Sequence, residues 1–125
     1  MIWDTNALTA FFNQDVRFLS FISEADTPVI PLIVVAEYRF GLEGSNRKAD
    51  ILPRFEAFLS SVSTLGCDME TTRHYARIAH HLKAAGRRIS QNDLWIAALA
   101  AQHDLPVASR DQDFDNLEGV ERQTW

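Results

Sequence analysis

Two acidic residues of this chain directly follow short apolar segments. Asp4 comes after Met1–Trp3, and Asp111 lies two residues beyond Val107–Ser109. Short apolar segments of this kind predict buried strands, so each acid is expected at the exit of a strand. In open parallel sheets, ligands bind outside the carboxyl ends of the strands. We therefore expect the two carboxylates to face one crevice.

Two further acids lie on predicted helices. Asp93 falls in the first turn of a helix that is apolar on nearly every side through 94–99, so this helix should be deeply packed with its N-terminus toward the crevice. Glu37 follows five apolar residues and lies between Ile33 and Phe40 on a stripe that we expect to be buried. A buried glutamate is seldom unpaired, so Glu37 needs a partner.

Three of the four acids also have a purely structural interpretation. Asp4 could cap the helix that follows it, and Asp111 could be a turn residue in an acidic loop. Ser90 and Asp93 form an S-x-x-D pattern, which is a capping-box signature. The four acids taken together are harder to explain as caps and turns than any one of them.

Four converging carboxylates need cations. Two carboxylates about 4 Å apart repel by about 4 kcal/mol at an effective dielectric constant near 20. Ligands that are all oxygen suit hard ions, so Mg²⁺ or Mn²⁺ is the expected occupant. A magnesium ion held by carboxylates keeps several waters, can activate one of them as a nucleophile, and neutralises charge on a phosphate.

Charge is distributed unevenly along the chain. The net charge of -5 argues against a general nucleic-acid coat. Residues 71–92, however, contain five Lys or Arg and no Asp or Glu, whereas residues 111–121 contain five acids and no Lys or Arg. Either the two segments form solvated faces that attract each other, or the acidic segment belongs to a metal-binding pocket whose basic rim guides a polyanion.

Composition is that of a globular protein. The chain has 125 residues, 46% of them apolar and 23% charged, which predicts a single domain over residues 1–125. The one cysteine, Cys67, excludes an internal disulfide, is expected in the core, and fits a cytoplasmic compartment. No stretch approaches the length of a membrane span, and no basic segment at the start indicates a signal peptide.

Short apolar strands alternate with helical patterns, which predicts an α/β fold with a parallel sheet covered on both faces. Strands are expected near residues 1–3, 28–31, 62–67, 107–109 and 120–124. Helices are expected from residue 7 onward and over 16–22, 32–42, 46–60, 69–85 and 91–102, with Gly44 ending the third and Pro53 kinking or breaking the fourth.

Several other site chemistries are disfavoured. The chain lacks G-x-x-x-x-G-K-[ST] and G-x-G-x-x-G loops, and the spacing of His74, His80 and His81 matches no standard zinc site. A phospho-acceptor receiver domain would need two adjacent early acids and a late lysine, but Asp4 is isolated and no lysine follows Lys83.

Four short motifs make the sequence recognisable. In order along the chain they are Asp4-Thr5-Asn6, Ala36-Glu37 leading to Gly41-Leu42, Asn92-Asp93-Leu94-Trp95-Ile96-Ala97-Ala98, and Ser109-Arg110-Asp111-Gln112-Asp113-Phe114. Together they resemble the PIN-domain family over nearly the whole chain. The closest branch looks like the VapC toxins of bacterial type II toxin–antitoxin pairs, or the similar FitB-like proteins.

The resemblance implies a three-layer fold with a central, mainly parallel sheet of about five strands between helices. It also implies a Mg²⁺-dependent endoribonuclease, with Mn²⁺ able to substitute. The alternative is a catalytically inactive PIN-like module that binds RNA or protein. The first strand is shorter than is usual in the family, and a threonine is more usual where Ser109 stands.

Matching motif by motif places four acids on the family's catalytic and metal-binding quartet: Asp4, Glu37, Asp93 and Asp111. Of these, Glu37 would orient or deprotonate the attacking water. Asn6, Ser109 and Asp113 fall on supporting positions. The candidates for RNA-phosphate contacts are Arg87, Arg88 and Arg110. The resemblance further implies a homodimer and a cognate VapB-like antitoxin, which would present an arginine to the carboxylates.

Overall fold

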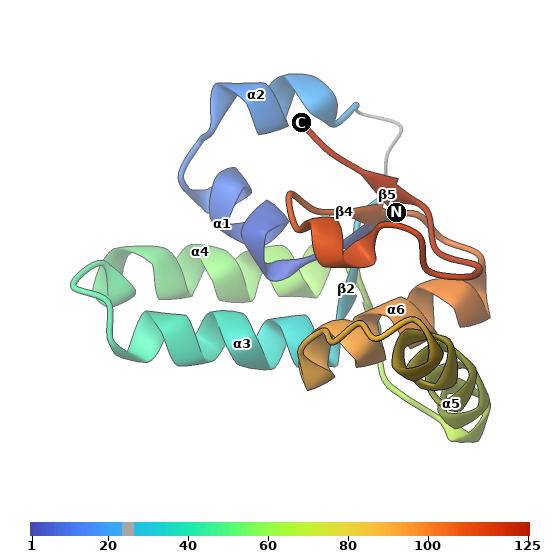
Figure 1. Ribbon diagram of the computed structural model, residues 1–125. Coiled ribbons are helices and arrows are strands. Elements are labelled where there is room, and N and C mark those ends of the chain that lie inside the picture. Colours follow the sequence, from blue (N-terminus) through green and yellow to red (C-terminus); the bar gives the residue numbers. More distant parts are fainter. Residues whose placement is uncertain (24–26) are drawn as a thin grey trace.

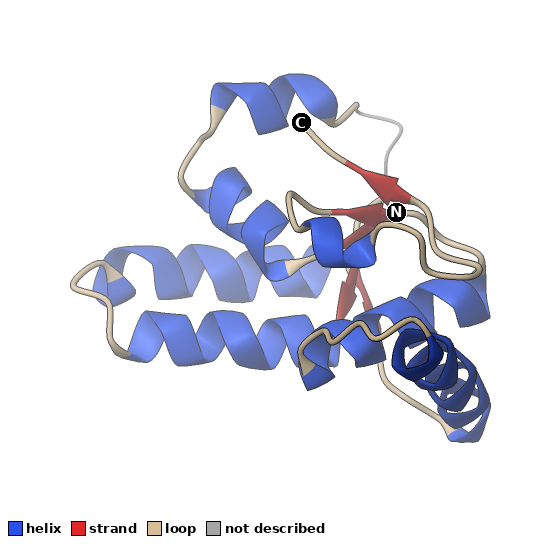
Figure 2. Cartoon of the chain, viewed as in Figure 1, coloured by secondary structure: helices blue, strands red, loops and turns tan. Residues whose placement is uncertain are grey.

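The computed structural model describes residues 1–23 and 27–125. Helices and strands alternate along the chain, as the hydrophobic pattern predicts (Figures 1 and 2). The strands are β1 (Ile2–Trp3), β2 (Val29–Pro31), β3 (Ser63–Leu65), β4 (Val107–Ala108) and β5 (Arg122–Gln123). The helices are α1 (Thr5–Phe12), α2 (Val16–Phe21), α3 (Leu32–Glu43), α4 (Lys48–Ser61), α5 (Met69–Ala84), α6 (Gln91–His103) and the short 3₁₀ helix η1 (Gln112–Phe114).

The strands form one parallel sheet in the order β3-β2-β1-β4-β5, with helices packed around it. Ile2 in β1 lies opposite Val29 in β2 and opposite Val107 in β4, so β1 is the central strand. Because every strand runs in the same direction, the carboxyl ends of β1 and β4 are neighbours at one edge. The predicted α/β fold is confirmed.

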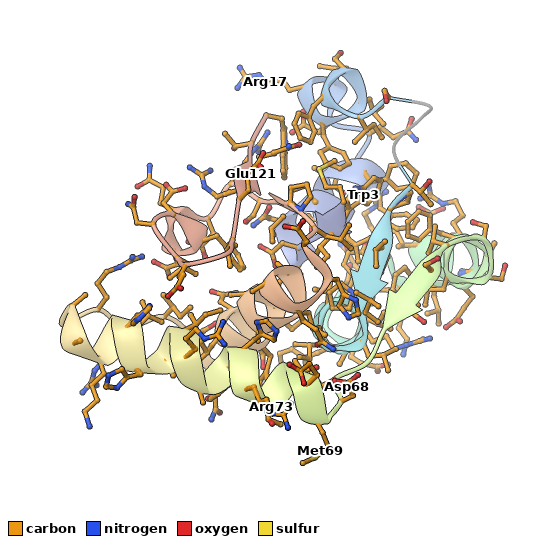
Figure 3. The ribbon with its side chains drawn as sticks, turned by 90° about the vertical axis from the view of Figure 1, so that its right-hand side faces the viewer. Trp3, Arg17, Asp68, Met69, Arg73 and Glu121 are labelled. Atoms are coloured by element: carbon orange, nitrogen blue, oxygen red, sulfur yellow. The ribbon has the colours of Figure 1, made fainter. Side chains whose placement is uncertain are left out.

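The core is a single cluster of buried side chains contributed by the sheet and the helices around it. Trp3 of β1 is only 2% exposed and lies inside the molecule, whereas Arg17 and Met69 point away from it (Figure 3). Helix α6 is apolar nearly all round because it is covered on most sides, and Ile96 and Leu99 are fully buried.

Local signals account for most helix boundaries. Asp4 caps α1, so this helix begins at Thr5 rather than at Ala7. Gly44 ends α3 as predicted, and Ser90 caps α6. Pro53 does not break α4, which continues through it to Ser61, although this proline lies inside the helix and cannot donate a backbone N–H.

Two burial predictions were wrong. Cys67 is exposed, because β3 ends at Leu65 on the edge of the sheet and the chain then runs over the surface into α5. Phe40 is 83% exposed, because the buried stripe of α3 passes through Val34, Tyr38 and Leu42 instead. Within the described part of the chain, no helix is long and apolar enough to cross a bilayer.

Candidate functional site

Asp4 lies where the sequence places it, at the exit of the central strand. Its side chain is 5% exposed, and its Oδ1 accepts a hydrogen bond from the backbone N–H of Thr5 at 2.7 Å. The residue therefore caps α1 while its carboxylate stays at the carboxyl edge of the sheet. The structural and functional interpretations of Asp4 are compatible with each other.

A hydrogen-bond network joins the exits of β1 and β4. Asn6 Nδ2 donates to Asp4 Oδ2 at 2.8 Å and to Ser109 Oγ at 3.0 Å. The Ser109 hydroxyl is buried, donates to Asp4 Oδ2 at 2.8 Å and accepts from the backbone N–H of Asp111 at 2.9 Å. Asn6 and Ser109 thus fix Asp4 and the start of the 111–115 loop relative to each other.

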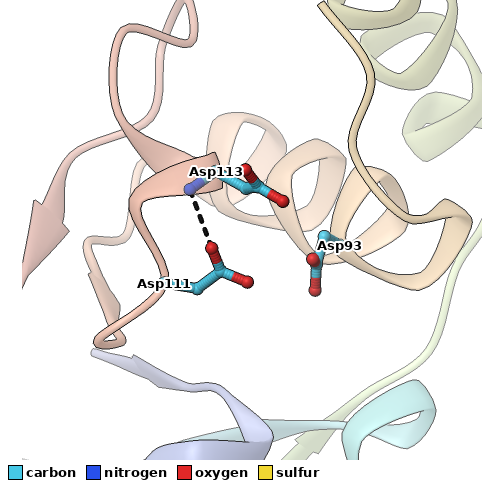
Figure 4. A group of neighbouring side chains, drawn as sticks. All are labelled: Asp93, Asp111 and Asp113. Carbon is cyan, nitrogen blue, oxygen red and sulfur yellow. Dashed lines mark hydrogen bonds between the residues drawn. The ribbon is translucent and has the colours of Figure 1, made fainter.

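Three aspartates form the tightest acidic group. Asp93, Asp111 and Asp113 each offer a carboxylate oxygen, and these oxygens all lie within 4.8 Å of one another (Figure 4). Asp93 reaches the group from the first turn of α6. Asp111 caps η1 by accepting a hydrogen bond from the backbone N–H of Asp113 at 2.9 Å, and this turn brings Asp113 back beside Asp111.

Glu37 approaches the same region from α3. Its Oε1 is buried and has no hydrogen-bond partner among the described residues, and the same holds for the nearby hydroxyl of Thr5. Burial, followed by repulsion from Asp4 and Asp93, raises the pKa of Glu37, while polar groups of Asn92 and Thr5 lower it in part. The partner that the sequence predicts for this glutamate is therefore supplied only in part by Asn92 and Thr5, and Oε1 remains without one.

The pKa values show that the acids share one electrostatic environment. Burial raises the pKa of Asp93 to about 6, with further contributions from Asp4, Asp111 and Asp113. Burial also raises the pKa of Asp4, to which Asp111 adds repulsion. Among the described residues, no Lys, Arg or His forms a salt bridge with any of the five site acids.

This donor set fits a hard divalent cation. All of the converging side chains offer carboxylate oxygens, which Mg²⁺ and Mn²⁺ prefer to softer ligands. The buried, unpaired oxygen of Glu37 is a second sign that the site is completed by a group from outside the chain. A cation would offset both the burial and the repulsion that raise these pKa values.

The raised pKa of Asp93 predicts a pH-dependent stability difference between the metal-free wild-type protein and the Asp93→Asn variant. Between the ordinary pKa of 3.8 and the folded value of about 6, the folded chain binds more protons than the unfolded chain. The Asp93 contribution to the free energy of unfolding therefore falls as pH rises through this window. In urea unfolding with EDTA, the free energy of unfolding of Asp93→Asn should rise relative to that of wild type from about pH 4 to pH 6. Above pH 6 the difference should level off. A difference that does not vary with pH would contradict the assigned environment.

The basic and acidic segments contact each other. Arg87 donates to the backbone carbonyls of Asp115 at 3.0 Å and Asp113 at 3.4 Å, which holds the acidic loop against the end of α5. His81 Nδ1 lies 2.7 Å from Glu118 Oε2. The interpretation of two mutually attracting faces is thus correct for part of these segments, and Arg87 has a structural contact in this loop.

The other two arginines proposed for RNA contacts differ in their surroundings. Arg110 pairs with Asp15 at 2.9 Å and stacks over the Trp125 ring at 4.8 Å, so its guanidinium is already engaged. Arg88 is exposed. All three arginines remain predictions as phosphate ligands; Arg87 is half-buried, whereas Arg88 and Arg110 are both exposed.

Comparison with known proteins identifies the family. The PIN-domain family model matches residues 1–120. The chain belongs to the PIN-domain family. It is 40% identical to ribonuclease VapC5 of Mycobacterium tuberculosis over 98 residues, which cover 76% of this chain and 72% of that protein. It is 31% identical to VapC ribonuclease Y4jK of Sinorhizobium fredii over 121 residues, covering 89% and 86%.

Solved structures of PIN-domain proteins show the same fold. The VapBC-5 structure from M. tuberculosis matches with a TM-score of 0.75 and 30% identity, covering 99% of this chain and 97% of the other. FitAcB from Neisseria gonorrhoeae matches with a TM-score of 0.73 and 30% identity, covering 89% and 87%. The resemblance to VapC-like and FitB-like proteins is thereby confirmed.

Sequence reasoning gave too little weight to two residues. Asp113 was counted as a supporting residue, with its place among the site acids left open, and the 3₁₀ turn of η1 brings it beside Asp111. Arg122 in β5 was not considered. It donates to the carbonyl of Ser109 at 3.1 Å and pairs with Asp115 at 2.6 Å, so it braces both ends of the acidic loop.

Proposed function

We propose that this PIN-domain protein is the endoribonuclease toxin of a type II toxin–antitoxin pair. One observation carries the proposal: carboxylates from four separate parts of the chain gather at one edge of the sheet without a balancing cation from a described residue. The family membership and the relatives named VapC ribonucleases support the same activity.

Mg²⁺ is the proposed cofactor, with Mn²⁺ able to replace it. Asp93, Asp111 and Asp113 would hold the ion, with Asp4 beside them, directly or through water. Bound there, it would make a water more nucleophilic and stabilise negative charge on the phosphodiester.

Glu37 is the proposed general base. Its pKa is raised, which brings the carboxylate closer to the pH at which it must accept a proton. The unpaired Oε1 can accept a hydrogen bond from the attacking water and then take its proton. Asn6 and Ser109 keep Asp4 oriented during this step, since both donate to the same carboxylate oxygen.

A VapB-like antitoxin is the proposed partner, and a homodimer is the proposed assembly, both acting in the cytoplasm. Complexes named VapBC and FitAcB among the similar structures support a small protein partner. An arginine from the antitoxin would find five acids that no described cation neutralises. The apolar side chains of Phe40 and Leu32 are exposed on α3 and support contact with another chain.

The ribonuclease proposal predicts metal-dependent cleavage. Purified protein incubated with total RNA should produce discrete fragments when Mg²⁺ or Mn²⁺ is added and none when EDTA is present. Re-addition of the metal should restore cleavage. Intact RNA after incubation with Mn²⁺ would instead favour the alternative of an inactive binding module, which the presence of all four predicted acids disfavours.

A further inference from the structure

A cleft of about 280 Å³ runs between α1 and α3. Thr5 and Thr9 line it from α1, Glu37 and Gly41 line it from α3, and Arg47 lies in its wall beyond the end of α3. Because Glu37 also belongs to the acidic site, the cleft adjoins the position where the phosphodiester would be cut.

The lining of the cleft is suited to hydrogen bonding. The Thr5 hydroxyl is buried and has no partner among the described residues, and the Thr9 hydroxyl donates to the Thr5 carbonyl at 2.9 Å. A hydroxyl can donate or accept, which matches the mixed donors and acceptors on the edges of a nucleobase. Arg47 donates to Asn13 Oδ1 at 3.0 Å and pairs loosely with Asp50 at 3.5 Å, and its exposed guanidinium adds a positive charge suited to a neighbouring phosphate.

Gly41 indicates that the cleft has to stay open. It lies inside α3, where glycine costs about 0.5–1 kcal/mol relative to alanine. Its backbone does not require glycine, since it is absent from the positive-φ residues. Packing does not require it either, because an added Cβ would meet nothing within 4 Å. What its missing side chain does provide is free space in the cleft.

We propose that this cleft is a nucleotide subsite, which binds the unpaired base next to the cleaved phosphodiester. The inference rests on the proposed ribonuclease function and adds a part of the substrate to it. Sequence-specific RNA recognition uses unstacked bases bound by their edges, and the cleft is below the size of typical drug-binding pockets. One nucleotide of a single strand is therefore the occupant, and a duplex is not.

The test measures RNA binding in an Asp93→Asn background, in which the proposed mechanism slows cleavage on the order of 10³-fold. Short single-stranded RNAs, each with one abasic position, are titrated in Mg²⁺ and followed by fluorescence anisotropy. Loss of the base at one position should weaken binding about tenfold. Adding Gly41→Leu should weaken binding of intact RNA about tenfold and remove the sensitivity to that position. Gly44→Ala, which changes the glycine at the end of the same helix outside the cleft lining, should behave like the background.

Folding is controlled in two ways. Leucine is a better helix former than glycine, so the urea concentration at the unfolding midpoint should be at least as high for Gly41→Leu as for the background. If it does not, Thr9→Leu fills the cleft from the opposite wall and should give the same binding result.

Two outcomes would overturn the subsite. In the first, Gly41→Leu binds every RNA as tightly as the background and Gly44→Ala do. In the second, Gly41→Leu leaves RNA binding unchanged but prevents neutralisation by the antitoxin, which would make the cleft a protein-binding site. If the wild-type protein binds RNA lacking the base at that one position more weakly but cuts no RNA, the ribonuclease proposal is refuted and the subsite proposal stands.

Discussion

Replacing Asp93 by asparagine is expected to lower kcat/KM for RNA cleavage on the order of 10³-fold. Asparagine keeps the size of the side chain, and the backbone N–H of residue 93 can still donate to Ser90 Oγ, so the cap of α6 is retained. What is lost is one negative oxygen from the group that Asp93 forms with Asp111 and Asp113. The measurement is the initial rate of fragment formation in Mg²⁺ under single-turnover conditions.

Asp104→Asn is the matched control for this substitution. Asp104 is exposed and follows the last residue of the same helix, in a left-handed conformation that asparagine tolerates. The chemical change is therefore identical, but it is made far from the acidic group. Asp104→Asn should cut RNA within about twofold of wild type. Equal rates for Asp93→Asn and wild type would show that Asp93 has no part in the reaction.

Divalent metal is expected to stabilise the folded protein. An ion that binds only the folded chain adds about 2.7 kcal/mol to the free energy of unfolding at a hundred times its dissociation constant. Thermal unfolding with increasing Mn²⁺ should therefore shift Tm upward in a concentration-dependent way. K⁺ at matched ionic strength separates binding at the site from general screening of the net charge of -5.

Asp93→Asn should change this behaviour in two opposite ways. Without metal, the variant should be more stable than wild type, because the repulsion among the buried carboxylates is reduced. When Mn²⁺ is added, the Tm of the variant should rise much less than that of wild type, because a metal ligand has been removed. Asp104→Asn should follow wild type in both conditions. A variant that is destabilised without metal and stabilised normally by Mn²⁺ would contradict the proposed role of Asp93.

The fold was predictable because its signals are local. Prolines bracket β2, Gly44 ends α3, and Asp68 and Ser90 start the last two long helices with side-chain caps. Each of these residues acts on its own segment, so no knowledge of the tertiary structure is needed to interpret it. The exposure of Cys67 was not predictable in this way, because it depends on β3 being an edge strand, which is a property of the strand order.

The same distinction between local signals and tertiary structure applies to the candidate site. Asp4 and Asp111 were found because strand direction alone brings the exits of neighbouring parallel strands together. The membership of Asp113 depends on the 3₁₀ turn of η1, and a spacing of two residues does not by itself predict such a turn. The surroundings of Arg110 were not predictable either, since nothing local indicates that its guanidinium contacts Asp15 and Trp125.

The most direct test of the metal site is an anomalous difference map from crystals grown with Mn²⁺. We expect one strong peak, or two close together, coordinated by carboxylate oxygens of Asp93, Asp111 and Asp113 on the side of the group that faces Asp4 and Glu37. Fully occupied Mn²⁺ bound elsewhere, with these carboxylates free of metal, would contradict the proposal that a divalent ion holds them together.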